Sequence, residues 1–262
     1  IMGSEEHGNF AARYGQEIDQ NSSFRVFAKH TKRDAGILPD GQNGSDDWDM
    51  QRGGFRYDST MSSGTNLMIQ GQVYTGNAGQ LVGFPTLTAP FTNTFADDAS
   101  LNGQFVLGRW SSNSSTRSKL NIQMYVDRTV RREAHANVET NTFDIEAQKR
   151  QQFSTIHDVV SGIGYRWNRD TVEASEVVAI NPSHDTYHLI NAFIQDEISL
   201  TDDLKLIVGS KIEYNSFSGV EIQPSARALW HVSNSNTLWT AASRAVRTPS
   251  RAGVGVSLNR AV

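Results

Sequence analysis

The sequence predicts an all-β protein, an antiparallel up-and-down transmembrane β-barrel of which about twelve strands are present. Long segments alternate apolar and polar residues with a period of two, which is the signature of a strand. These segments run well beyond the roughly five or six residues of an ordinary soluble strand. The connections between them alternate along the chain between tight polar turns and longer loops. Together these three observations are typical of an outer-membrane barrel.

The expected strands follow one another along the chain. They cover residues 8–17, 23–34, 48–58, 65–75, 100–110, 119–130, 141–153, 157–169 and 184–200. The stretch 191–251 holds three long amphipathic segments, joined by tight turns at 201–203 and 233–236. Pro249 is expected to end the last strand, because proline cannot donate to a strand ladder. Gly253 and Gly255 are interpreted as strand glycines, and Arg251 as a rim residue.

Alternation assigns two faces to these strands. The expected apolar positions are Phe10, Ala12 and Tyr14, then Phe24, Val26 and Ala28, then Leu67, Ile69 and Val73, then Leu120, Ile122, Met124 and Val126, then Phe143, Ile145 and Ala147, then Val159, Ile163, Tyr165 and Trp167, and finally Leu204, Leu206, Val208, Ile212 and Tyr214. The other face carries polar residues that suit a wet or plugged lumen, namely Gln70, Gln72, Gln123, Asp127, Asp144, Glu146, Gln148, Lys211 and Glu213.

The connections predict which strand ends lie at the same rim. The tight set covers residues 18–22, 59–64, 111–117, 154–156, 201–203 and 233–236. The long set covers residues 35–47, 76–99, 131–140 and 170–183, and only the short connection 216–219 departs from the alternation. An up-and-down barrel places each set on its own rim. Five aromatic residues near the tight turns fit an interfacial girdle, namely Tyr14, Tyr57, Trp110, Trp230 and Trp239.

Composition excludes several classes of protein. The 262 residues carry a net charge of −4 without a basic block, so no nucleic-acid surface is expected. The absence of cysteine excludes disulfides and thiolate chemistry, and no cofactor is expected. No run of 18 apolar residues occurs, which excludes a helical membrane span. The first residues lack the pattern of a signal peptide, and since a barrel protein must be exported, we expect the true start to lie upstream.

Four stretches near the end of the chain resemble the mid-barrel region of TonB-dependent outer-membrane receptors. They are FIQDEI (193–198), GSKIE (209–213), QPSAR (223–227) and TLWTAASRAVRTP (237–249). VFAK (26–29) and DDWDMQRGGFR (46–56) resemble the first barrel strands of the same family, so the resemblance spans nearly the whole chain. It implies localisation in the outer membrane of a Gram-negative bacterium, in contact with outer-membrane lipid.

The same resemblance implies a barrel of about 22 strands with an N-terminal plug domain. It also implies energy-coupled uptake of a scarce small molecule, such as an iron-siderophore or another nutrient, driven by the TonB complex. Residues 1–262 are therefore expected to be an incomplete receptor barrel domain that lacks the plug and the final strands.

Candidate site residues are few. The expected loop 76–99 carries Phe84, Phe91 and Phe95, which are candidates for ligand capture, although aromatic residues also pack long loops down. Asp40, Asp46 and Asp47 lie in an acidic loop that offers oxygen ligands for Ca²⁺. Their spacing does not fit an EF-hand, and no other metal site is expected.

Other functions remain open on the sequence alone. No HExxH or GxSxG motif occurs, and adjacent pairs such as His157 and Asp158 point to opposite faces of a strand, so an enzyme is not expected. The alternatives are a complete twelve-stranded passive pore or outer-membrane enzyme, which needs the first and last strands to pair, and a soluble all-β binding module.

Overall fold

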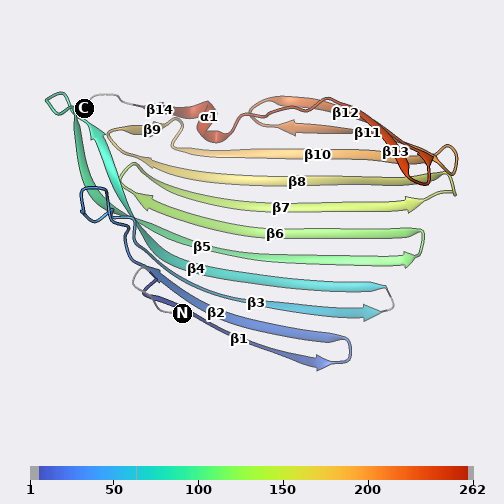
Figure 1. The fold of residues 1–262 in the computed structure, drawn as a ribbon, viewed down its shortest axis with the longest axis horizontal. Coiled ribbons are helices and arrows are strands. Elements are labelled where there is room, and N and C mark those ends of the chain that lie inside the picture. The colour runs from blue at the N-terminus through green and yellow to red at the C-terminus, as the bar shows by residue number, and fades with distance from the viewer. Residues whose placement is uncertain (1–5, 63, 259–262) are drawn as a thin grey trace.

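The computed structural model describes residues 6–62 and 64–258 and consists almost entirely of strands (Figure 1). Twelve strands form one antiparallel sheet in which every strand pairs with the next one of the sheet along the chain. In order they are β1 (Gly8–Asp19), β2 (Ser22–Arg33), β3 (Trp48–Ser62), β4 (Thr65–Pro85), β5 (Thr92–Ser115), β6 (Ser118–Glu133), β7 (Ala136–Gln152), β8 (His157–Ala174), β10 (His184–Ser199), β11 (Leu204–Asn215), β12 (Gly219–Ser233) and β13 (Asn236–Ser243). The predicted fold class is confirmed.

The strand registers place the alternating residues on two continuous faces, as predicted. Cross-strand partners share a face, so the register joins Val106, Val126, Phe143 and Trp167 into one row across β5 to β8. The side of the sheet that carries this row is called the apolar face below. The opposite side, which carries Asp127, is called the polar face. Every lumen candidate named from the sequence lies on the polar face.

Exposure identifies the polar face as the inner one. The large apolar side chains of the apolar face are solvent-exposed, for example Ile163 at 65% and Ile212 at 52%. Buried side chains in the strands, such as Val172 and Glu213, lie mostly on the polar face. The sheet is curved (Figure 1), and side chains crowd on the inside of a curved sheet and spread apart on its outside. The apolar face is therefore the outer surface, which in a membrane barrel contacts lipid.

The connections divide between the two ends of the sheet, and the predicted set of tight turns is confirmed. Residues 20–21, 116–117, 153–156, 200–203 and 234–235 join strands at one end, which lies at the right of Figure 1 and is called the turn edge. β3 ends and β4 begins at the same end, at Ser62 and Thr65. The opposite end is called the loop edge, and residues 34–47 form a loop there as expected. The expected loop 170–183 is shorter, because residues 170–174 belong to β8, and residues 175–183 include the short strand β9 (Val178–Ile180).

Two of the expected long loops are wrong. Residues 76–99 mostly form a tall hairpin in which β4 and β5 stay paired from Thr65 to Pro85. Only residues 86–91 at its tip lie outside the strands. Residues 131–140 belong to β6 and β7, which are joined by the two-residue turn 134–135. Glycine and acidic residues favour a loop when read locally, but neighbouring strands on both sides extend the ladder through them.

Irregularities in the strand registers gather at the turn edge. The registers shift between Glu17 and Asp19, between Thr60 and Ser62, between Ser112 and Ser115, and between His231 and Ser233. Each shift lies directly beside a tight turn. Between these points the pairing of the described residues runs without a shift, which keeps both faces continuous over the whole height of the sheet.

Four of the five residues expected in an aromatic girdle lie on the apolar face, namely Tyr14, Tyr57, Trp110 and Trp230. Trp110 pairs with Ile122 inside the strands and not at their ends, so the girdle stays a prediction. Trp239 is paired with Leu229 on the opposite face, so its assignment to the girdle is wrong. A register shift lies between His231 and Ser233, just before the turn into β13. Alternation counted across this shift assigns Trp239 to the wrong face.

The end of the chain differs from the prediction. β13 ends at Ser243 rather than at Pro249, and Arg251–Gly255 forms a short helix, α1, so Gly253 and Gly255 are not strand glycines. The three-residue strand β14 (Val256–Leu258) then pairs with β9 (Val178–Ile180) in the loop between β8 and β10. None of the helices within residues 6–62 and 64–258 is long and apolar enough to cross a membrane.

Arg251 is buried, in contrast to the rim position expected for it. Its side chain is 10% exposed, and its Nε lies 3.1 Å from Oδ2 of Asp170 and 3.6 Å from Oδ2 of Asp185. Asp170 is itself only 4% exposed. This charge cluster fixes the segment after β13 to the loop-edge ends of β8 and β10.

The two outermost strands of the sheet are open. Within the described residues, β1 pairs only with β2 and β13 pairs only with β12, so the first and last strands do not meet. A closed twelve-stranded barrel requires that contact, and the alternative of a complete twelve-stranded pore or enzyme is therefore wrong.

Candidate functional site

The polar face is a wall of paired charges. Basic side chains on it contact acidic or amide side chains on the same strand or the next one, in the pairs Arg56–Asp58, Arg109–Gln123, Arg150–Asp158, Arg166–Asp144, Lys205–Glu197 and Lys211–Glu213. Burying a charge is costly unless it is paired, so this pattern suits a face that lies inside a larger assembly. These pairs give the polar face many hydrogen-bonding groups.

One part of this wall is hollowed between β7 and β11. Nε of Arg166 donates to Oδ2 of Asp144 at 2.8 Å, and Nζ of Lys211 donates to Oε2 of Glu213 at 2.5 Å. Together with Asn191 and neighbouring residues these pairs line a hollow of about 420 Å³. Gly164 lies at its floor, where an added Cβ would meet Nδ2 of Asn191 at 2.8 Å. The arrangement can bind a polar group, but its own charges already satisfy one another.

The aromatic candidates lie on the tall hairpin at the loop edge. The rings of Phe84 on β4 and Phe95 on β5 meet edge to face, with centroids 5.4 Å apart. The imidazole of His135, from the turn between β6 and β7, lies 5.4 Å from the ring of Phe84. The registers place Phe84 and Phe95 on the polar side of the hairpin. These three half-buried rings form a cluster, called the rim cluster below, on the inner side of the rim.

Phe91 does not join the rim cluster. It lies at the tip of the hairpin, is 62% exposed and has a positive φ of 65°. The structure thus brings together two of the three phenylalanines expected to act in ligand capture. The sequence did not predict His135 as a member of this cluster. It lies in a segment that reads as a loop, and no periodic pattern there indicates a contact with Phe84.

An acidic residue fixes the tall hairpin to the turn beside it. Oδ2 of Asp97 on β5 accepts hydrogen bonds from the backbone N–H of Ala134 at 3.0 Å and from Nε2 of Gln80 at 3.1 Å. The hydrogen bond from Ala134, followed by that from Gln80, holds the pKa of Asp97 below its ordinary value. By holding Ala134, Asp97 positions the next residue of the turn, His135, against Phe84.

The acidic loop 34–47 uses its side chains to shape its own backbone. Oδ1 of Asp46 accepts the N–H of Gly36 at 2.6 Å, and Oδ1 of Asp40 accepts the N–H of Gln42 at 3.0 Å. Asp47 instead contributes its carbonyl oxygen, which accepts the N–H of Gly79 on the tall hairpin at 2.7 Å. No group of three or more His, Cys, Asp or Glu side chains within residues 6–62 and 64–258 is arranged to hold a metal ion.

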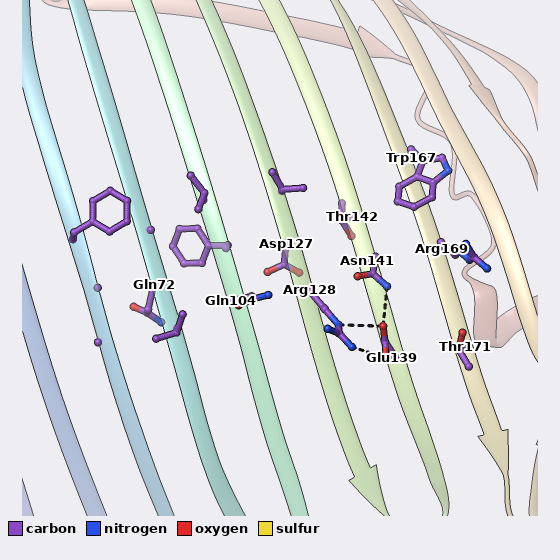
Figure 2. Close-up of a pocket in the computed structure, with 18 residues that line it drawn as sticks. Gln72, Gln104, Asp127, Arg128, Glu139, Asn141, Thr142, Trp167, Arg169 and Thr171 are labelled. Carbon is purple, nitrogen blue, oxygen red and sulfur yellow. Dashed lines mark hydrogen bonds and ion pairs between the residues drawn. The ribbon is translucent and has the colours of Figure 1, made fainter.

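A further hollow lies mainly on the apolar face (Figure 2). It measures about 1010 Å³ and is lined by residues of β3 to β8. Figure 2 shows Arg128 and Asn141 both directed at Glu139, which accepts Nη2 of Arg128 at 3.0 Å and Nδ2 of Asn141 at 3.1 Å. We call this depression the outer hollow.

Comparison with known proteins identifies the family of this chain. A family model described as "TonB dependent receptor-like, beta-barrel" matches residues 6–257. The chain belongs to the TonB-dependent receptor family. As a barrel of such a receptor it lies in the outer membrane of Gram-negative bacteria, and the alternative of a soluble all-β module is wrong. No curated protein matches the chain.

Solved structures of TonB-dependent receptor barrels share the fold. The siderophore receptor PirA from Pseudomonas aeruginosa is 12% identical with a TM-score of 0.68, and the match covers 92% of this chain and 40% of that protein. The copper transporter OprC is 13% identical with a TM-score of 0.70, covering 92% and 45%. The ferric citrate transporter FecA, in its unliganded form, is 14% identical with a TM-score of 0.58, and the match covers 87% of this chain and 39% of that protein. The chain thus spans less than half the length of these proteins.

Proposed function

We propose that this protein takes part in energy-coupled uptake of a scarce small molecule across the outer membrane, and that it is not an enzyme. The single observation that carries the proposal is the match of the receptor-barrel family to residues 6–257. The structurally similar proteins include the siderophore receptor PirA, the copper transporter OprC and the ferric citrate transporter FecA. A metal complex such as an iron-siderophore is therefore the proposed class of ligand.

We further propose that residues 1–262 are part of a larger receptor barrel of about 22 strands, which also has a plug domain that engages the TonB complex. The open strands β1 and β13 support this proposal, because each leaves a row of backbone N–H and C=O groups to be paired. In hydrocarbon every such group must be satisfied within the protein, so further strands of the same barrel are the natural partners. The paired charges of the polar face then surround the plug.

Ligand capture is assigned to the rim cluster of Phe84, Phe95 and His135, with Phe91 at the hairpin tip as the first point of contact. Aromatic rings on a rigid hairpin offer a large contact area without much loss of side-chain freedom. The cluster lies on the inner side of the rim, which a ligand must pass to reach the lumen.

An uptake assay tests the function. Cells that express the protein from its complete reading frame are given radioactive iron as a ferric catecholate, a ferric hydroxamate and ferric citrate, and copper in parallel. We expect accumulation of at least one of these that stops when a protonophore removes the inner-membrane energy source. Accumulation that is indifferent to the protonophore, or none beyond that of cells without the protein, would contradict the proposal.

Substitutions then test the capture site with the ligand found in that assay. Phe84→Ala and Phe95→Ala should each weaken binding roughly ten-fold, the equivalent of about 1.4 kcal/mol lost from aromatic contact. Phe153→Ala is the control for the loss of a phenyl ring elsewhere, because Phe153 is exposed (69%) at the turn edge, the opposite end of the sheet. Unchanged affinity in both rim variants would remove the rim cluster from the proposal and leave the uptake function standing.

A further inference from the structure

The polar face is basic on β1 to β3, in contrast to the paired charges that cover it from β5 to β11. Its cations on these strands, called the basic patch below, are Arg13, Arg25, Lys29, Arg33, Arg52 and Arg56. The acidic side chains of the same face, within the described part of these three strands, are Glu17 and Asp58. Uncharged residues separate these cations along the chain, so only the pairing of the strands gathers them.

The register places like charges directly opposite each other at two levels of the basic patch. Lys29 on β2 is paired with Arg52 on β3, and four residues nearer the turn edge Arg25 is paired with Arg56. Like charges in directly opposite positions destabilise a sheet, because their Cβ atoms lie only about 4.5–5.5 Å apart. Asp58 lies 2.7 Å from Arg56 and partly compensates the second pair. The repeated opposition indicates a negative charge that comes from outside the sheet.

The neighbouring strands supply no counter-charge to Lys29 and Arg52. The residue paired with Lys29 on β1 is Ala11, and the residue paired with Arg52 on β4 is Tyr74. No side chain within residues 6–62 and 64–258 forms a hydrogen bond or ion pair with either cation. A strand added beyond β1 would be separated from Lys29 by β1 itself, at about 4.8 Å per strand. The counter-charge must therefore reach this pair from the lumen.

An aromatic ring lies between the two levels of cations. Phe27 follows Arg25 and precedes Lys29 on the polar face of β2. Its ring covers Gly54 of β3, where an added Cβ would approach Cε1 of Phe27 to 2.7 Å. Arg13 on β1 is the cross-strand partner of Phe27. The basic patch thus surrounds an apolar surface, and its two levels are about 13 Å apart at 3.3 Å per residue.

From the opposed cations we infer that the basic patch is a binding site in the lumen for a small molecule with several negative charges, such as a metal complex of net negative charge. The anion contacts Lys29 and Arg52 together, and its apolar part lies on the ring of Phe27. Charge complementarity selects this occupant, because two adjacent cations without a counter-charge attract a multivalent anion more strongly than a monovalent or neutral ligand. The inference rests on the proposed function and deepens it, since it states the charge of the ligand.

Citrate, which carries three negative charges at neutral pH, is the probe for this site. The protein is expressed from its complete reading frame and held in detergent, and binding is measured by calorimetry and by the midpoint of thermal unfolding. We expect citrate to raise the midpoint of the wild type in a saturable manner, and acetate at the same ionic strength to leave it unchanged. Lys29→Gln and Arg52→Gln should each weaken citrate binding about ten-fold, the loss expected for one hydrogen bond to a charged group.

Arg227→Gln is the matched control. Arg227 is an exposed cation of the polar face on β12, and its cross-strand partners are Ile207 and Ala241, so it opposes no like charge. This variant should bind citrate as the wild type does. Far-UV circular dichroism checks that each variant is folded.

The midpoint without citrate gives a second readout that does not depend on binding. Removing one charge from an opposed pair relieves repulsion, so Lys29→Gln should unfold at the same temperature as the wild type or at a higher one. A lower midpoint would overturn the inference, because it would show that an acidic group of the protein itself, such as one on a plug domain, already pairs with Lys29.

Two results of the binding measurement would also overturn the inference. Unchanged citrate affinity in both Lys29→Gln and Arg52→Gln would remove the opposed pair from the site. An equal loss in Arg227→Gln would reduce the effect to general charge attraction. Uptake is measured in cells and citrate binding on the purified protein, so this inference and the proposed function can each fail while the other stands.

Discussion

The outward direction of the apolar face can be tested with two neighbouring residues of β6. Ile122 lies on the apolar face, and Asn121 lies on the polar face. Six residues separate Ile122 from Arg128, the first charged residue on the apolar face of β6 toward the loop edge. At about 3.3 Å per residue this is roughly 20 Å along the strand, or about 14 Å of depth for a strand tilted near 45°. Ile122 therefore lies close to the middle of an apolar band about 25 Å tall.

Arginine at these two positions should have very different costs. Ile122→Arg places a charge against hydrocarbon near the midplane and should lower the free energy of unfolding by about 2–4 kcal/mol. Asn121→Arg places the same charge on the polar face, at a small hollow that Arg109 and Glu146 also line, so one neighbour repels it and the other attracts it. This variant should change the free energy of unfolding by less than about 1 kcal/mol.

Urea unfolding of the protein refolded into lipid vesicles, followed by tryptophan fluorescence, measures both values. The wild type and Ile122→Leu serve as references. A cost for Asn121→Arg as large as that for Ile122→Arg, or a cost below about 1 kcal/mol for Ile122→Arg, would refute the assignment of the apolar face to lipid.

Two further predictions concern contacts at the loop edge. Because the pKa of Asp97 is lowered in the folded protein, its stabilisation of the tall hairpin is present at neutral pH and is lost as pH falls below about 4. Limited proteolysis of the hairpin should accelerate over that range, and Asp97→Asn should remove the dependence on pH. Arg251→Met leaves the buried Asp170 without its cation, and breaking such a pair typically costs about 3–5 kcal/mol. Amide exchange of α1 should then rise sharply, whereas a rate equal to wild type would show that the ion pair does not hold the segment.

The sequence was sufficient to predict the strands and faces of the sheet, because alternate residues of a barrel strand face opposite sides. A period of two assigns every residue of β6 to a face without knowledge of its neighbours, and the register confirms each assignment. The same rule failed where a local reading competes with pairing. Gly76 and Gly79 suggested a loop, yet they lie in a ladder that continues to Pro85. Trp239 was misplaced because a register shift lies just before it.

The candidate sites were predicted less well, since they depend on contacts between distant segments. Phe84 and Phe95 were named from an apparent loop, but His135 reaches them only through the hairpin geometry and the hydrogen bond of Asp97 to Ala134. The pairing of Arg251 with Asp170 joins residues 81 positions apart and leaves no trace in local composition. The outer hollow is lined by residues of six neighbouring strands, β3 to β8, which only the register brings together.

The location of the register shifts beside the tight turns bears on how such a sheet can change during evolution. An insertion or deletion of one residue in the middle of a strand would move every later side chain of that strand to the opposite face. Charged side chains would then face lipid, and apolar side chains would face the lumen. A bulge absorbs the odd residue before it does harm. Because the shifts between Glu17 and Asp19 and between Ser112 and Ser115 lie next to turns, small length changes are harmless there. Homologous chains should therefore vary in length by single residues at the turn edge and only by pairs within the strands.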